Sequence, residues 1–153
     1  MEIVLADNAA RIGQIRALFE EYWAEFGFTP CFQNFSHEVA NLPGDYAPPG
    51  GRLFLALVRG EPAGCGALRR LDAERVEAKR LYVRPKFRCQ GIGHALLDWA
   101  LTEARCSGYR EIVGDTMPVM QRALDMYERL GFERTGPYSL EPTPGAIYLR
   151  FRL

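Results

Sequence analysis

The stretch that decides the fold is Glu77-Ala-Lys-Arg-Leu-Tyr-Val-Arg-Pro-Lys-Phe-Arg-Cys-Gln-Gly-Ile-Gly-His-Ala-Leu-Leu-Asp-Trp-Ala100. Its first part has the pattern of a strand, which turns at Arg84-Pro85, and its last part enters an amphipathic helix through Gly91-Ile92-Gly93. Glycine lets a backbone approach a ligand closely, because it has no Cβ. The start of a helix presents unpaired N–H groups and a partial positive charge. We therefore expect an anion site, most simply for a phosphate, between this strand and this helix.

Two common kinds of phosphate loop do not fit this stretch. A nucleoside-triphosphate loop needs Lys and then Ser or Thr after its last glycine, where this chain has His94 and Ala95. A dinucleotide loop needs a third glycine, where this chain has Leu96. A different kind of loop is required.

The remaining loop, Arg88-Cys89-Gln90-Gly91-Ile92-Gly93, resembles the R/Q-x-x-G-x-G/A pyrophosphate loop of the GNAT superfamily of acyl-CoA N-acyltransferases. Further along, Met126-Tyr127-Glu128-Arg129-Leu130-Gly131-Phe132 resembles the family's L-Y-x-x-x-G-F signature. The resemblance extends over nearly the whole chain, but only Glu77 to Phe132 carries specific motifs.

The resemblance implies an enzyme, an N-acetyltransferase that uses acetyl-CoA as cosubstrate and no metal. It implies transfer of the acetyl group to a primary amine of a small molecule or to an exposed amino group, by direct attack in a ternary complex. Many relatives are dimers, so the resemblance is compatible with a homodimer.

Length and composition favour one domain over residues 1–153. Hydrophobic residues make up 48% of the chain and charged residues 25%, as in ordinary globular proteins. Basic and acidic residues balance at 19 each, so we expect neither a nucleic-acid nor a membrane partner. No apolar run approaches the roughly 20 residues that span a bilayer, and the N-terminus does not resemble a signal peptide. A cytoplasmic location is the resulting expectation.

Hydrophobic periodicity predicts strands over residues 2–6, 52–58, 63–70, 75–83, 109–115, 132–134 and 146–152. It predicts one helix that Asp7 or Asn8 caps and Gly27 ends, and three more over residues 32–42, 92–106 and from Asp115 or Thr116 to Leu130. The resemblance arranges these elements as an α+β fold. This fold has a mixed, mostly antiparallel sheet of about six to seven strands with helices on both faces. Its one parallel pair, residues 75–83 with 109–115, should splay apart.

In the GNAT fold the pantetheine arm of the cosubstrate lies in that splay. The resemblance therefore assigns cosubstrate binding to two groups of residues, the strand end Leu81, Tyr82 and Val83, and the loop Arg88, Cys89, Gln90, Gly91, Ile92 and Gly93. The strand would pair with pantetheine through its backbone. The loop N–H groups, helped by the Arg88 side chain, would bind the pyrophosphate.

The resemblance suggests two catalytic side chains. Tyr127 matches the tyrosine that donates a proton to the departing CoA sulfur, although a tyrosine at an apolar helix position is often only core. Glu77 matches the strand glutamate that serves as base in some relatives. The alternative for Glu77 is a surface carboxylate opposite Lys79 or Arg75, with Glu74 and Glu25 as rival bases. The developing oxyanion would be stabilised by a backbone N–H near Arg80 to Tyr82.

Two residues depart from the family pattern. Cys89 stands where many relatives have glycine, so a positive φ at that position would cost about 1–2 kcal/mol. Met120 stands where many have an asparagine that contacts the cosubstrate arm. These departures motivate an alternative function, a CoA-binding sensor or partner subunit without catalysis. A redox-responsive thiol at Cys89, beside a helix start, is a third hypothesis.

Overall fold

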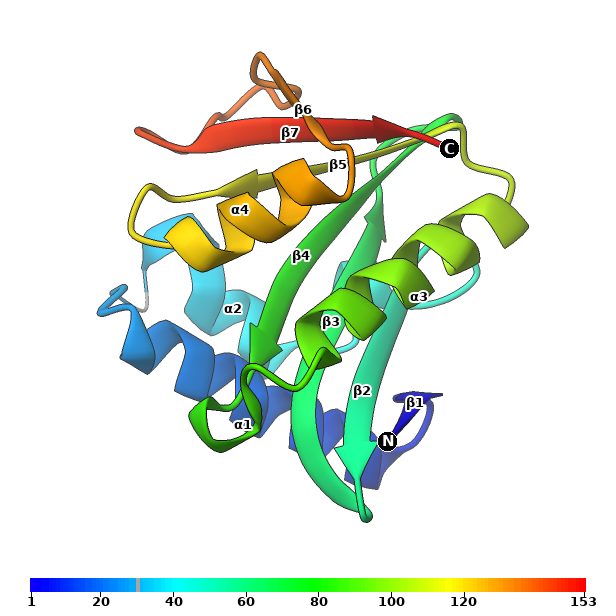
Figure 1. The fold of residues 1–153 in the computed structure, drawn as a ribbon, viewed down its shortest axis with the longest axis vertical. Coiled ribbons are helices and arrows are strands. Elements are labelled where there is room, and N and C mark those ends of the chain that lie inside the picture. The colour runs from blue at the N-terminus through cyan, green and yellow to red at the C-terminus, as the bar shows by residue number, and fades with distance from the viewer. Residues whose placement is uncertain (30) are drawn as a thin grey trace.

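The computed structural model describes residues 1–29 and 31–153, which form a seven-stranded sheet with helices on both faces (Figure 1). The strands lie in the order β1-β2-β3-β4-β5-β7-β6. Their bounds are Glu2–Leu5 (β1), Arg52–Val58 (β2), Glu61–Arg70 (β3), Arg75–Val83 (β4), Glu111–Thr116 (β5), Glu133–Thr135 (β6) and Ile147–Arg152 (β7). The α-helices are Ala9–Glu25 (α1), Phe35–Ala40 (α2), Ile92–Cys106 (α3) and Gln121–Arg129 (α4). The predicted α+β fold class is confirmed.

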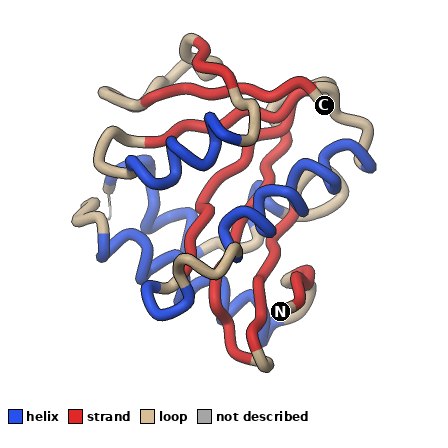
Figure 2. Tube along the Cα trace, in the orientation of Figure 1, coloured by secondary structure: helices blue, strands red, loops and turns tan. Residues whose placement is uncertain are grey.

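The sheet has one parallel pair, and that pair opens as predicted. β4 and β5 are in register only at Arg75↔Glu111, Val76↔Ile112 and Glu77↔Val113, and every other neighbouring pair is antiparallel. Beyond Glu77 the two strands diverge, as their tubes show in Figure 2. The second half of β4 therefore keeps an open backbone edge toward β5.

Two hydrophobic cores lie on opposite faces of the sheet. β2 alternates between them, because successive side chains of a strand point to opposite faces. Phe54 packs on the α3 face against Trp99, with ring centroids 4.5 Å apart, whereas Leu53 and Leu55 pack on the α1 face. In Figure 1, α3 and α4 cover the near face and α1 and α2 the far face.

β4 carries a bulge that interrupts this alternation. Cys65 of β3 pairs with Tyr82 and Ala67 pairs with Lys79, so the single residue between them faces two residues of β4. Arg80, one of these two, has φ 59°. As a result Ala78 and Leu81 both belong to the core on the α3 face, and Tyr82 belongs to the opposite core.

Two glycines of β3 have close neighbours. A Cβ on Gly66 would stand 2.5 Å from the Phe54 ring, and one on Gly64 would stand 2.6 Å from the Tyr82 carbonyl oxygen. Both distances lie well inside van der Waals contact. Glycine at these two positions therefore allows the close packing of β3 against β2 and β4.

Two predicted helix starts are wrong. The last helix begins at Gln121, and its N-cap is Met120, which makes no side-chain capping bond; Asp115 and Thr116 instead end β5. The second helix is divided into a short 3-10 turn, Phe32–Asn34, and α2, because Gln33 and Asn34 both adopt positive φ. Within residues 1–29 and 31–153, no helix is both long and apolar enough to cross a membrane.

Candidate active site

A groove of about 730 Å³ opens where β4 and β5 diverge. Its walls come from the end of α1, the second half of β4, the start of α3 and one side of α4. It is lined by nearly all the residues predicted to bind the cosubstrate, namely Leu81, Tyr82, Val83, Arg88, Cys89, Gly91, Ile92 and Gly93. Gln90 does not line it, and its amide donates to the Lys86 carbonyl oxygen at 3.3 Å.

The start of α3 forms one end of the groove. Gly91 precedes the helix with φ 78° and provides no side-chain cap, so the first helical N–H groups keep their hydrogen-bonding capacity. Cys89 also has positive φ, at 62°. This is the left-handed conformation in which a Cβ is strained. Cys89, which stands where many relatives have glycine, therefore occupies a position whose backbone favours glycine.

Arg88 fixes the loop to the body of the protein. Its guanidinium donates to the Val83 carbonyl oxygen at 2.9 Å and to the Glu25 carboxylate at 2.6 Å. It also lies 5.7 Å from the centroid of the Tyr82 ring. Its charge is thus largely compensated by α1, and the loop is held at the wall of the groove.

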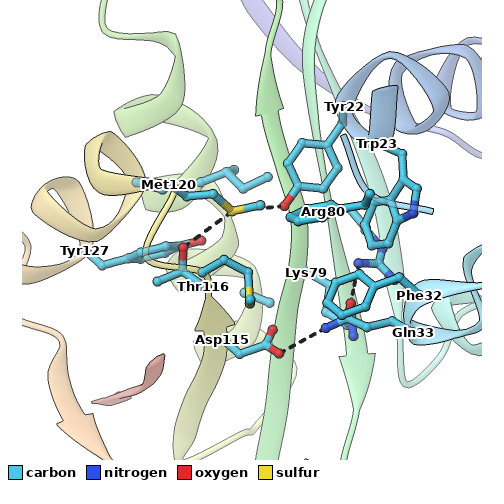
Figure 3. Close-up of a pocket in the computed structure, with 15 residues that line it drawn as sticks. Tyr22, Trp23, Phe32, Gln33, Lys79, Arg80, Asp115, Thr116, Met120 and Tyr127 are labelled. Carbon is cyan, nitrogen blue, oxygen red and sulfur yellow. Dashed lines mark hydrogen bonds between the residues drawn. The ribbon is translucent and has the colours of Figure 1, made fainter. Parts of the chain in front are cut away.

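A second, smaller cavity of about 40 Å³ adjoins the groove (Figure 3). Tyr22, Leu81, Met120 and Ala123 line both spaces. Aromatic side chains form one wall and polar groups from β4 and β5 form another: Trp23, Phe28, Phe32, Lys79, Arg80, Asp115 and Thr116. The two cavities therefore meet beside the bulge of β4.

Met120 stands at this junction. Its sulfur accepts hydrogen bonds from the Tyr22 hydroxyl at 3.4 Å and the Thr116 hydroxyl at 3.6 Å (Figure 3). The aromatic side chains of α1 both pack in the core and line the small cavity. Trp23 stacks on Phe35 at 4.1 Å, and both Tyr22 and Trp23 also face the small cavity.

The two predicted catalytic side chains lie in different surroundings. Tyr127 lines the small cavity, and burial raises the pKa of its hydroxyl above the ordinary value, which keeps it a proton donor. Glu77 lines neither cavity; its carboxylate is held by Arg69, accepts from the Tyr138 hydroxyl at 2.6 Å, and is 4.0 Å from Lys79 Nζ. The structure thus places Tyr127 in the lining of the small cavity and leaves Glu77 outside both spaces.

Known proteins resemble the chain across most of its length. The model of the acetyltransferase (GNAT) family matches residues 14–132. The chain belongs to the GNAT acetyltransferase family. An uncharacterized N-acetyltransferase of Schizosaccharomyces pombe is 33% identical over 144 residues, which cover 93% of this chain and 88% of that protein.

Solved structures agree with this assignment. An acetyltransferase from Streptococcus agalactiae superposes with a TM-score of 0.84 at 21% identity, covering 99% of this chain and 98% of its own. A GNAT acetyltransferase from Elizabethkingia anophelis, solved with acetyl-CoA bound, has a TM-score of 0.59 at 30% identity over 68% of this chain and 77% of its own. The GNAT assignment, the fold and the acyltransferase class inferred from the motifs are all confirmed.

This GNAT acetyltransferase also has a buried ion pair that the sequence analysis missed. Arg80 donates to both carboxylate oxygens of Glu38 at 2.8 Å and to the Gln33 side-chain oxygen at 2.9 Å, and it lies 4.5 Å from the centroid of the Trp23 ring. Burial opposes ionisation of Glu38, but the hydrogen bonds from Arg80, together with the positive charges of Arg80 and Lys79, hold the pKa of Glu38 below its ordinary value. The pair joins the bulge of β4 to α2.

Five polar residues of the small cavity were absent from the sequence-based site: Gln33, Lys79, Arg80, Asp115 and Thr116. The sequence indicated two of them, because Lys79 and Arg80 are adjacent cations within a predicted strand. Successive side chains of a strand point to opposite faces, so in a sheet covered on both faces both cations would be directed at a covered face. Gln33 belongs to an irregular segment without periodicity, so no local pattern indicated it.

We predict that Cys89→Gly raises the free energy of unfolding by about 1 kcal/mol, because glycine adopts positive φ without steric strain. Urea denaturation measures this change. Cys89→Ala is the matched control, since it removes the thiol but keeps the Cβ and should give no such gain. Equal stabilities of the two variants would contradict the strain.

We predict that Glu38→Gln lowers the free energy of unfolding by about 3 kcal/mol at neutral pH, because it leaves Arg80 buried without its counter-ion. Because the folded-state pKa of Glu38 is lowered, the stabilisation by its carboxylate is present above the unfolded-state pKa. It is lost as the pH falls through the folded-state value. Urea denaturation from pH 7 down to about pH 3 should therefore show that the difference in free energy of unfolding between wild type and Glu38→Gln decreases as the pH falls.

Glu128→Gln is the control for Glu38→Gln, because Glu128 pairs with Arg134 at an exposed site. It should change stability by less than about 0.5 kcal/mol. An advantage of wild type over Glu38→Gln that stays constant across the acidic range would rule out the buried carboxylate as its source.

Proposed function

We propose that this protein is an acetyl-CoA-dependent N-acetyltransferase that holds the cosubstrate in the large groove and a small primary amine in the adjoining cavity. The observation that carries the proposal is the junction of the two spaces at Leu81 and Met120. A donor bound in one space and an acceptor bound in the other would meet there. Direct transfer in a ternary complex requires this arrangement.

The residues of the groove fit acetyl-CoA. The open edge of β4 offers backbone groups to the amides of pantetheine, as an added strand would use them. The start of α3 offers unpaired N–H groups to the pyrophosphate. The acetyl-CoA bound to the relative from Elizabethkingia anophelis supports the same assignment here.

The cosubstrate would supply an acetyl group activated as a thioester. The N–C bond forms as the C–S bond breaks, and an acceptor that arrives as an ammonium gives up two protons. We assign one proton to a carboxylate, which releases it to solvent. The other proton replaces the one that the Tyr127 hydroxyl gives to the departing sulfur. The raised pKa of Tyr127 suits this donor role.

Two carboxylates compete for the role of base. Asp115 lines the small cavity and has one long hydrogen bond, from the Gln33 amide at 3.4 Å. Glu77, expected from the resemblance, lines neither cavity and is held by Arg69 and Tyr138. We propose Asp115 as the group that accepts the proton directly, and Glu77 as a positioning residue for Lys79.

We predict that Tyr127→Phe lowers kcat about 100-fold, because it removes the proton donor while keeping the ring that packs on Phe132. Release of CoA thiol measures turnover. Thermal melts with acetyl-CoA, free CoA and ADP form the control. For both Tyr127→Phe and wild type, acetyl-CoA at 100 times its dissociation constant should add about 2.7 kcal/mol of stability.

An unchanged kcat in Tyr127→Phe would remove Tyr127 from the mechanism. CoA-dependent stabilisation without turnover of any amine would instead favour the alternative, a non-catalytic CoA-binding module. No stabilisation by either CoA species would exclude the groove as a cosubstrate site.

We predict that Asp115→Asn lowers kcat about 100-fold or more at neutral pH and that the loss shrinks as the pH rises and free amine becomes available. Glu77→Gln should lower kcat less and should leave the shape of the pH profile unchanged. Profiles of kcat from pH 6 to pH 10 compare the two variants directly. The reverse ranking would assign the base to Glu77.

A further inference from the structure

Lys79 is a buried cation without a close partner. Its side chain is 9% exposed and lines the small cavity. Within residues 1–29 and 31–153, its ammonium forms no hydrogen bond, and its nearest carboxylate oxygen is Glu77 Oε2 at 4.0 Å. That oxygen already accepts from Tyr138, and its neighbour in the same carboxylate accepts from Arg69.

The other charged groups near Lys79 either have ion-pair partners of their own or make no direct contact with its ammonium. Arg80 is paired with Glu38 and Arg69 with Glu77. Asp115 faces the same cavity from β5, and among the described residues it forms no ion pair with Lys79 within 4.0 Å. The cavity therefore presents one positive and one negative group that do not neutralise each other in direct contact (Figure 3).

A buried ammonium with unused hydrogen-bonding capacity is costly, and an anion that fills the cavity relieves the cost. Burial, and then the charge of Arg80, lower the pKa of Lys79, which is the expected response to a missing counter-ion. A carboxylate that donates no proton and accepts several hydrogen bonds suits a lysine with three free donors. The amine to be acetylated belongs near Asp115, the proposed base.

The size of the cavity limits how far apart these two groups of the acceptor lie. A volume of about 40 Å³ holds on the order of three water molecules. A short headgroup, with its amine and its carboxylate close together, suits a space of this size lined by both Lys79 and Asp115. The wall formed by Trp23, Phe28 and Phe32 is apolar, so it suits an apolar substituent next to that headgroup.

We infer that the acceptor is a small α-amino carboxylate with an apolar side chain, whose carboxylate binds Lys79 and whose amine faces Asp115. This inference rests on the proposed acetyl transfer. Lys79 is then the residue that selects the acceptor, because amines without a carboxylate leave its ammonium buried and unpaired. The acetyl transfer itself follows the proton balance given above.

The experiment compares matched acceptors. L-methionine and L-phenylalanine are each assayed with acetyl-CoA against their amides and against the amines that lack the carboxyl group, 3-(methylthio)propylamine and 2-phenylethylamine. We expect kcat/KM for the acids to exceed that for both analogues by about 100-fold. An α-amino amide is the more easily deprotonated amine, so basicity alone would give the opposite order for the amides.

Lys79→Met should abolish this preference while keeping the volume of the side chain, because kcat/KM for the acids should fall toward the values for their amides. Arg110→Met is the control, because it removes an exposed cation just before the start of β5, at the end away from Asp115. It should preserve the preference. Amides or amines that are used as well as the acids, or a preference that survives Lys79→Met, would overturn the inference.

A binding measurement separates this inference from the proposed function. Isothermal titration of L-methionine and L-phenylalanine into the CoA-saturated protein reports on the acceptor cavity without catalysis. Binding that Lys79→Met removes and Arg110→Met retains supports the inference, even if no acceptor is turned over and the proposed function fails. Absence of binding to the wild-type protein overturns the inference.

Discussion

The buried ion pair between Arg80 and Glu38 is the constraint on which the site depends. It anchors α2 to the bulge of β4, and it orients Gln33 in the turn before α2 through the same guanidinium. Gln33 in turn reaches Asp115 on β5 and the Thr143 hydroxyl, at 2.8 Å, in the segment between β6 and β7. One compensated charge thus joins three parts of the chain that are far apart in sequence around a single cavity.

The same pair bears on the charge of the small cavity, whose polar wall carries one cation without a close partner. Arg80 and Arg69 each have a carboxylate partner, so their charges are satisfied within the protein. Lys79 directly precedes Arg80 on β4, and its nearest carboxylate oxygen is 4.0 Å away. Buried pairs are weak sources of stability but effective in fixing geometry, and here the geometry leaves one cation, Lys79, in the lining of the small cavity.

The sequence was most informative where backbone geometry determines function. The glycine loop and the strand before it predicted the groove, because a loop that approaches phosphate and a splayed parallel pair leave clear patterns. The small cavity was largely missed. Glu38 and Gln33 lie in a short, irregular segment, and their significance depends on tertiary contacts with Arg80 that no local period encodes. Likewise, the final helix starts at Gln121 because Asp115 and Thr116 are taken up by pairing with β7.

The bulge in β4 determines which face of the sheet each side chain of this strand occupies. Val76, Ala78, Leu81 and Val83 all pack on the α3 face, a spacing of two, three and two that regular alternation does not produce. The extra residue at the bulge is what turns Tyr82 to the α1 face, the face of Lys79 before the bulge. Removing one residue there would exchange the faces of every side chain on one side of the deletion. The number of residues between Glu77 and Pro85 is therefore constrained by the two faces of the sheet, whatever the types of those residues.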